Sequence, residues 1–165
     1  MTGPATPPPP TFWQRRVMAP LRAQLTQGVT PERLALTIGV GTACSLLPFL
    51  GFTSLLNLGV GLALRLNQPI LQTLNQALGP LQLALILGYV RVGEWLWQAP
   101  PMPISPATII ASFREDPGAF LTRFGWTGVH AASAWVLSVP LIVAAIYFPL
   151  RPVLRRFGAR GTSRP

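Results

Sequence analysis

The chain has 165 residues, of which half are hydrophobic and only 10% are charged, and its formal net charge is +9. A soluble domain carries about a quarter charged residues, and here the charges are missing from long blocks, which favours an integral membrane protein. All 13 basic residues are arginines that flank the apolar blocks. This placement predicts contact with anionic lipid headgroups and argues against a nucleic-acid partner. Cys44 is the single cysteine, so an internal disulfide is excluded and a packing role is expected.

Residues 1–30 are expected to lie outside the membrane domain. The four prolines at positions 7–10 favour a disordered, extended tail. The segment 11–27 mixes aromatic residues with arginines, which suits either the headgroup level of a membrane or an ordinary solvated lead-in. The sequence Thr30-Pro31-Glu32 predicts a helix start, with a capping hydroxyl, a proline in the first turn and an acid at the positive end of the dipole.

The first apolar block runs from residue 34 to residue 64 without a charge and is interrupted by Pro48 and Gly51. One continuous helix of this length would measure roughly 46 Å, against about 30 Å of hydrocarbon core. Each arm alone is too short to cross. We therefore predict a re-entrant helical hairpin that turns at Pro48–Gly51, returns to its side of entry and stays out of the far leaflet. Small residues at helical spacing are expected to let the arms approach, namely Thr37, Gly41, Ser45, Gly59 and Ala63.

The fold class is expected to be all-α, and the rest of a single membrane domain, residues 31–156, is expected to contain two further transmembrane helices. Residues 70–97 form a span broken at Gly79 and Pro80, although its first arm could also be re-entrant. Residues 98–118 form a loop with a short helix starting at Ser105-Pro106 and ending near Asp116. Residues 119–150 form the last span, in which Pro140 predicts a kink, and 157–165 form a basic tail.

Charge placement predicts the threading of the chain. Arginines gather before the first block and after the last one, so both termini are expected on the cytoplasmic side of the bacterial inner membrane. The number of full crossings is then even. A re-entrant first block with two later crossings satisfies this condition, and it places Arg65 on the cytoplasmic side.

Four short motifs in order carry a resemblance to a known family: PERLA at 31–35, IGV at 38–40, LPFLGFT at 47–53 and LRLNQP at 64–69. Their order and spacing resemble the small bacterial membrane family known as domain of unknown function 2062. The resemblance covers 31–97 well and 119–156 loosely. The chain has Gly79-Pro80 where that family has Asn-Pro, and Phe52-Thr53 where a polar residue commonly follows the turn glycine. The family has no established activity, so the resemblance implies a fold type and a location only.

Polar residues inside the apolar blocks are the candidate site. Ser54, Asn57 and Arg65 are expected beside the hairpin, with Asn57, Gly61 and Arg65 on one helical face. These residues could form a polar track in which Arg65 binds an anionic headgroup or substrate. The favoured interpretation is structural: Arg65 reaches the cytoplasmic surface and Asn57 bonds a neighbouring helix. Asn67 and Asn75 belong to a group of carboxamides that either satisfy backbone groups freed by the prolines or coordinate a polar solute.

The remaining polar residues predict no chemistry. Arg91 and Glu94 are expected to form an ion pair of small energy, and His130 to be a packed or interfacial residue. No catalytic set, metal ligand set or cofactor motif is legible, so an enzyme is not expected. Two functions remain open. The paired broken helices could bind or move a small solute or lipid, with the protein as a homo-oligomer, or the chain could be a non-catalytic membrane interaction or assembly protein.

Overall fold

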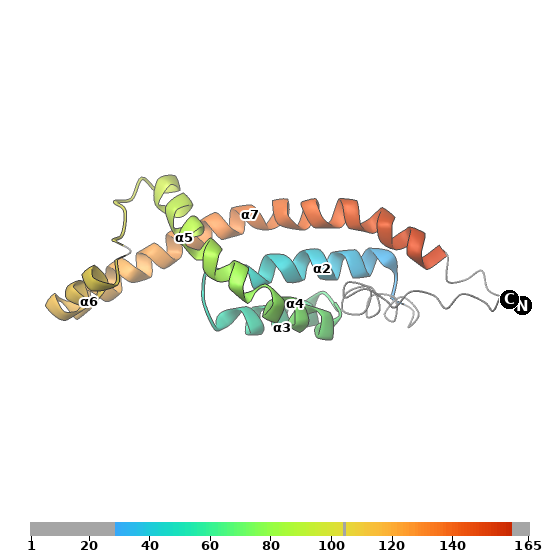
Figure 1. Cartoon of the computed structure of the whole chain (residues 1–165), viewed down its shortest axis with the longest axis horizontal. Helices are drawn as coiled ribbons and strands as arrows, with labels where there is room; N and C mark the ends of the chain where they lie inside the picture. The colour runs from blue at the N-terminus through green and yellow to red at the C-terminus, as the bar shows by residue number, and fades with distance from the viewer. Residues whose placement is uncertain (1–28, 104, 160–165) are drawn as a thin grey trace, which may run out of the picture.

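The computed structural model describes residues 29–103 and 105–159, and every regular element in these ranges is a helix (Figure 1). The expectations for the proline-rich tail and for the segment 11–27 lie outside the described residues. The helices are α2 (Pro31–Ser45), α3 (Phe52–Ala63), α4 (Gln68–Ala77), α5 (Gly79–Leu96), α6 (Pro106–Glu115) and α7 (Pro117–Ala159).

The start of α2 follows from its local sequence. The Thr30 side chain caps the helix by accepting a hydrogen bond of 3.3 Å from the Arg33 N–H. Pro31 occupies the first turn, where its missing N–H costs no hydrogen bond, and Glu32 follows at the positive end of the helix dipole. The predicted helix start is thereby confirmed.

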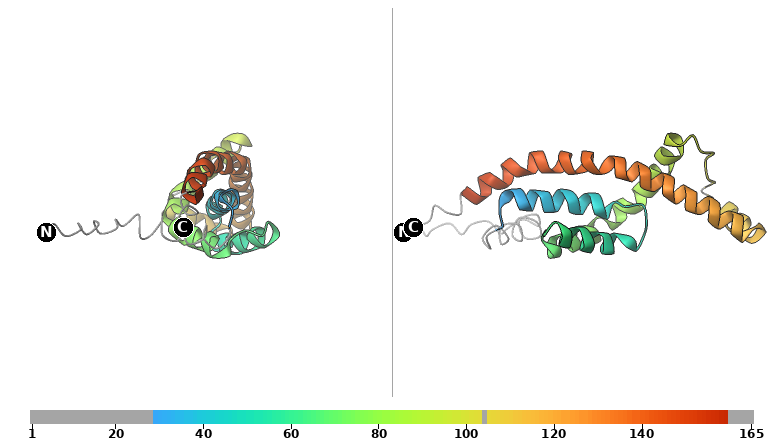
Figure 2. Two further views of the ribbon diagram at one scale, coloured as in Figure 1. Left: turned by 90° about the vertical axis from the view of Figure 1, so that its right-hand side faces the viewer. Right: turned by 180° about the vertical axis from the view of Figure 1, so that it is seen from behind.

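α2 is the central helix of the molecule. Seen along the long axis, it lies between α7 on one side and α3 with α4 on the other (Figure 2). Leu34 and Ala35 are fully buried and pack with Leu154 of α7. Glycines allow the close approach: a Cβ on Gly39 would lie 3.3 Å from the Val143 carbonyl oxygen of α7. The apolar first arm is therefore enclosed by the protein itself.

α3 returns antiparallel to α2 after the turn at residues 46–51 (Figure 1). The predicted hairpin of two helical arms is therefore present. The predicted stripe of small residues is buried on the first arm, but Gly41 lies against Leu71 of α4 and not against the second arm. The prediction is wrong on the second arm, because Gly59 and Ala63 are exposed. The buried face of α3 instead carries Thr53, Asn57 and Gly61, which repeat every four residues.

α4 and α5 are separated only by Leu78 and meet at an angle of 69°, so the predicted break at Gly79-Pro80 is confirmed. α5 then crosses α7 at close range. A Cβ on Gly93 would fall 2.2 Å from the His130 carbonyl oxygen, so only glycine fits there. Beside the crossing, the Trp97 indole stacks on the His130 ring at 5.5 Å, which confirms the packed histidine.

The loop after α5 leads into α6, which is capped by Ser105 as expected. α7 is longer than the predicted span at both ends. It begins at Pro117, directly after Asp116, and continues to Ala159 through three internal prolines, arching over α2 (Figure 1). The tail predicted from residue 157 is therefore partly helical. An Asp116 oxygen accepts from the Ala119 N–H at 2.9 Å and holds the first turn.

Three contacts fix the register between the hairpin and α7. Glu32 pairs with Arg155, the Ala43 carbonyl accepts from the Trp135 indole N–H at 2.8 Å, and the Phe49 ring packs on Gly128. Within the described residues, α7 alone is long and apolar enough to cross a membrane as one helix. The bent pair α4–α5 meets the same test when it is taken as one span.

Candidate functional site

The two breaks in the helices lie against each other. In the hairpin turn Pro48 is buried, and Gly51 adopts a left-handed conformation with φ of 86° that favours glycine. The side-chain amide of Gln82, in the first turn of α5, donates a hydrogen bond of 2.8 Å to the Leu47 carbonyl oxygen. A backbone acceptor freed by one break is therefore satisfied by a residue that the other break positions.

Asn57 is the polar centre of the hairpin. It is fully buried, and its amide nitrogen donates to the Thr53 carbonyl at 3.0 Å and to the Ser45 hydroxyl at 3.2 Å. Its side-chain oxygen has no hydrogen-bond partner. Rotating the amide by 180° would place that oxygen against the Thr53 carbonyl, which cannot donate a proton. Asn57 therefore presents an unsatisfied acceptor inside the protein.

Asn75 of α4 lies at the same end of α3. Its amide nitrogen is 2.8 Å from the Ser54 hydroxyl, and Gln72 donates to the Ser54 carbonyl at 3.3 Å. The Asn75 oxygen is also without a partner. Because the Ser54 hydroxyl can donate or accept, the Asn75 amide can turn either its oxygen or its nitrogen toward that hydroxyl. The structure thus brings Ser54 and Asn75 into contact.

Arg65 and Asn67 lie elsewhere. The end of α3 at Ala63 is about 14 Å along the helix from Ser54, and both residues follow that end. The expectation that Arg65 continues the face of Asn57 is wrong: Arg65 comes after the helix in a left-handed conformation with φ of 52°. Its carbonyl accepts from the Arg33 guanidinium at 3.4 Å. Asn67 caps α4 by accepting from the Ile70 N–H.

The polar cluster, defined here as Ser45, Ser54, Asn57, Asn75 and Gln82, joins α2, α3, α4 and α5. Most of its N–H groups donate to carbonyl or hydroxyl oxygens of another turn or helix. These bonds support the structural interpretation of the carboxamides. Of the two oxygens left without a partner, that of Asn57 can only be an acceptor in its place, so a ligand bound to Asn57 must donate a hydrogen bond. Among the described residues, no group of three or more His, Cys, Asp or Glu could hold a metal ion.

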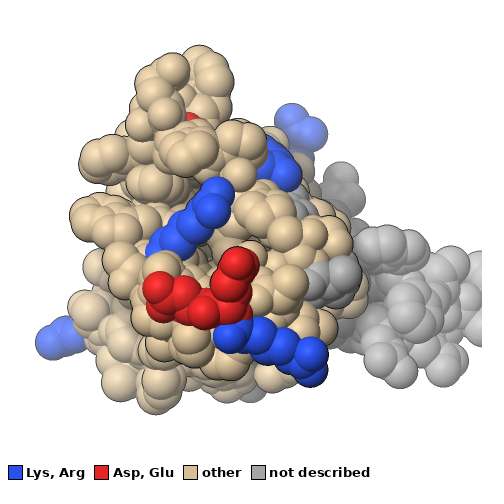
Figure 3. Space-filling model, turned by 90° about the vertical axis from the view of Figure 1, so that its left-hand side faces the viewer, with Lys and Arg blue, Asp and Glu red and all other residues tan. Residues whose placement is uncertain are grey.

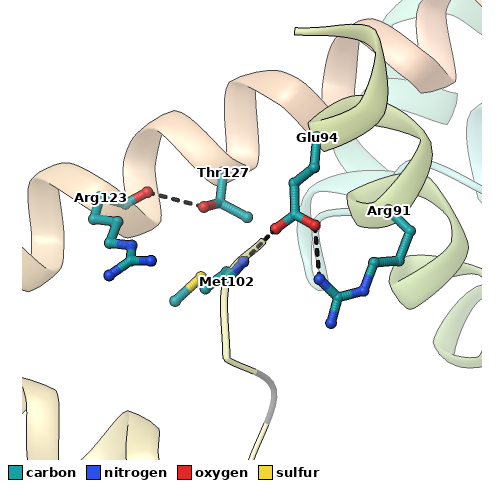
Figure 4. A network of polar contacts seen from close by, with 5 residues as sticks. All are labelled: Arg91, Glu94, Met102, Arg123 and Thr127. Carbon is teal, nitrogen blue, oxygen red and sulfur yellow. Dashed lines mark hydrogen bonds and ion pairs between the residues drawn. The ribbon is translucent and has the colours of Figure 1, made fainter. Parts of the chain in front are cut away.

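A second polar centre lies at the far end of α5 (Figure 4). Glu94 is 5% exposed, and its carboxylate pairs with Arg91 at 2.7 Å and accepts a hydrogen bond of 2.6 Å from the Met102 N–H. It therefore anchors the loop between α5 and α6. Sequence reasoning found the pair but missed the burial of Glu94. The available signal was a lone acid one helical turn from an arginine, followed at once by a proline-rich loop.

Charges at the α6 end of the molecule are mixed. In Figure 3 acidic side chains lie together with basic side chains on either side, on a surface that is otherwise uncharged. A cavity of ≈ 210 Å³ between α6 and α7 is lined there by Glu115, Asp116 and Arg123. The opposite end carries Arg33, Arg65 and the arginines of the last turns of α7.

Comparison with known proteins identifies one relationship. The profile of a family described as "uncharacterized protein conserved in bacteria (DUF2062)" matches residues 14–161, nearly the whole chain. No curated protein and no solved structure matches it.

Proposed function

The chain belongs to this uncharacterised bacterial family, and we propose that it is an inner-membrane protein that binds a small hydrogen-bond-donating solute at its helix breaks. The proposal assigns it no enzyme activity. The unsatisfied oxygen of Asn57 is the single observation that carries the binding site, and the exposure of α7 supports the location.

The surface of α7 favours a membrane environment. Only 11% of an apolar 18-residue stretch of α7 is buried, whereas the core helix of a soluble protein would be mostly buried. Leu141 is 72% exposed and Phe148 is 68% exposed. Exposed apolar area on this scale is unfavourable in water, and lipid tails would cover it.

The proposed threading keeps both ends of the described chain on the cytoplasmic side. The contact between Arg33 and the Arg65 carbonyl supports it, because the chain returns after the hairpin to the level at which it started. The bent pair α4–α5 and α7 then make the two crossings. The loop that Glu94 anchors falls on the periplasmic side.

In the proposed threading the hairpin reaches deeper than the sequence led us to expect. Phe49 packs on Gly128, and residues 128 and 150 are about 33 Å apart along α7. That length matches a whole hydrocarbon core. In this threading the turn therefore lies in the far leaflet, although the chain returns to its side of entry.

Single cysteines in a Cys44→Ser background test the threading. We expect an impermeant thiol reagent added to the periplasmic side to label Ala111→Cys and to spare Arg65→Cys and Arg156→Cys. Periplasmic labelling at position 65 would show that the first block crosses the membrane, and the threading would have to be redrawn.

The cost of the unpaired Asn57 acceptor indicates what kind of solute would bind. A buried polar group without a hydrogen bond costs roughly 1–3 kcal/mol, and Asn57 cannot remove that cost by turning its amide. A bound donor would offset it. The five residues of the polar cluster carry no charge, so a neutral solute such as a polyol or urea suits it best.

Stopped-flow light scattering of proteoliposomes tests whether a solute that binds also crosses the membrane through the protein, with glycerol and urea as the probes. We expect the protein to raise permeability above that of empty vesicles, Asn57→Ala to abolish the increase, and Gln76→Ala, an exposed carboxamide on α4, to retain it. Elution as a single species and helical circular dichroism check that both variants fold. Equal permeability with and without the protein would favour the second candidate.

That second candidate is a membrane assembly protein, and the outer face of α3 favours it. Gly59 has no atom within 4 Å of an added Cβ, and Leu55 beside it on the exposed surface is 66% exposed. If another protein or a second copy packs on this face, Gly59→Trp should disrupt the complex while the monomer stays folded. Gly41→Trp serves as the contrast, because its Cβ would already approach Leu71 to 2.7 Å.

A further inference from the structure

A groove between α2 and α7 runs from the arginine-rich end along the outside of the molecule. Its volume is ≈ 440 Å³, within the range of small-molecule sites. Glu32 and Arg33 form one end, and Leu36, Val143, Ala144 and Phe148 line the rest. The groove therefore has a charged end and an apolar trough, formed by the residues that line the rest. This combination is complementary to an elongated amphiphile.

The trough follows one face of α7. Pro140, Val143, Ala144, Tyr147 and Phe148 recur at the spacing of a single helical face, and together they extend about 12 Å along the axis. Pro140 and Phe148 are exposed at its edge, so the groove opens sideways and not into the interior. A molecule in it would remain in contact with whatever surrounds α7.

The charges at the mouth favour an anion. Glu32 is engaged by Arg155 at 2.5 Å and lies 3.6 Å from the Arg151 Nε. Together with Arg33 these side chains sum to two net positive charges. The Arg151 Nε–H is buried and has no hydrogen-bond acceptor, since 3.6 Å is too long for a bond to Glu32. A donor without an acceptor is thus present beside surplus positive charge.

We propose that this groove is a binding site for an anionic phospholipid. The phosphate lies at the mouth against Arg33 and Arg151, and one acyl chain lies in the trough beside Leu36 and Ala144. Arginine binds phosphate oxygens through a planar pair of donors, and such charge-assisted bonds are the stronger ones. The proposal rests on the membrane location proposed above, and it is independent of the solute at Asn57.

Binding is measured on the full chain in detergent, by native mass spectrometry and by thermal shift, with phosphatidylglycerol, phosphatidylcholine and inorganic phosphate as probes. We expect phosphatidylglycerol to bind more tightly than phosphatidylcholine and inorganic phosphate to have no effect. Arg33→Gln at the mouth and Ala144→Phe in the trough should each weaken phosphatidylglycerol binding roughly three- to tenfold.

Two variants are matched controls. Arg156→Gln removes an exposed arginine at the same end, and Leu121→Phe enlarges a 60% exposed side chain near the other end of α7. Both should bind as the native chain does. Equal binding of the two lipids, an equal loss in Arg156→Gln, or a shift caused by inorganic phosphate alone would overturn the proposal. Arg33 is exposed, so its variant remains informative if Ala144→Phe fails to fold.

Extraction separates this proposal from the one on which it rests. If alkaline carbonate releases the chain from membranes, the membrane location is wrong whatever the lipids do. If the chain stays in the membrane fraction and the lipids bind equally, the location stands and the groove proposal fails.

Discussion

Gln82 and Leu47 are joined across the two helix breaks by a hydrogen bond of 2.8 Å from the side-chain amide of one to the backbone carbonyl of the other. The bond connects α5 to the hairpin turn, at the point where the chain changes direction twice. This bond explains why a glutamine stands in a leucine-rich arm. It supplies the donor that a helix would otherwise have provided.

Replacing Gln82 by leucine should lower the free energy of unfolding by about 1–2 kcal/mol, because the Leu47 carbonyl loses its donor in an apolar setting. The unfolding midpoint in detergent measures the loss. Gln76→Leu is the control, since that carboxamide is exposed on α4. Equal stability of the two variants would mean that the bond contributes nothing.

Gly93→Ala should destabilise the crossing of α5 and α7 strongly, because the new Cβ would overlap the His130 carbonyl at 2.2 Å. Backbone atoms cannot give way cheaply, so we expect a loss of about 1–3 kcal/mol, as for overpacked cores. Gly88→Ala on the same helix meets no atom within 4 Å. That control should gain up to about 1 kcal/mol from helix propensity. Melting temperatures of the two variants should therefore move in opposite directions.

Gly51→Ala probes the turn. The site is open, with no atom within 4 Å of an added Cβ, but its φ of 86° is strained for alanine. We expect a cost of about 1–2 kcal/mol from the left-handed backbone alone. Gly79→Ala at the other break is equally open and has no such φ, so it should be neutral or stabilising. Chemical unfolding of both variants distinguishes strain from crowding.

Acid should weaken the attachment of α2 to α7. The pKa of Glu32, at the arginine-rich end, lies below its usual value of 4.5 because of a backbone hydrogen bond and the Arg155 guanidinium. A carboxylate with a depressed pKa in the folded state contributes stability that is present above its unfolded pKa. That contribution is lost as the pH falls through the folded value.

The measurement is the melting temperature between about pH 7 and about pH 3. Glu32→Gln should be less stable than the native chain at neutral pH, and the difference should shrink on acidification. A difference that stays constant with pH would show that the carboxylate charge does not contribute.

The elements were predictable because their signals are local. Pro31 and Thr30 mark one helix start, Ser105 marks another, and prolines with glycines mark both breaks. The resemblance stated from four motifs is confirmed by the family match over residues 14–161. The length of α7 was underestimated, since Asp116 caps it one residue before a proline that begins rather than ends a helix.

The site was predictable only in part, because it depends on how helices meet. The sequence alone singles out Asn57, Asn75 and Ser54 as polar residues in apolar arms. Spacing alone could not show that α3 stops before Arg65, which removes that side chain from the cluster. Nor could it show that Gln82 faces the other break, since the two are distant in sequence.

The enclosure of α2 has a consequence for biogenesis. α2 is the first of the described helices to leave the ribosome, and α7, which covers one of its sides, is the last. Until synthesis is complete, Trp135 cannot reach the Ala43 carbonyl and Arg155 cannot reach Glu32. The early arm therefore stays incompletely packed until α7 has been made, and a nascent chain cut short before α7 should be degraded faster than the full chain.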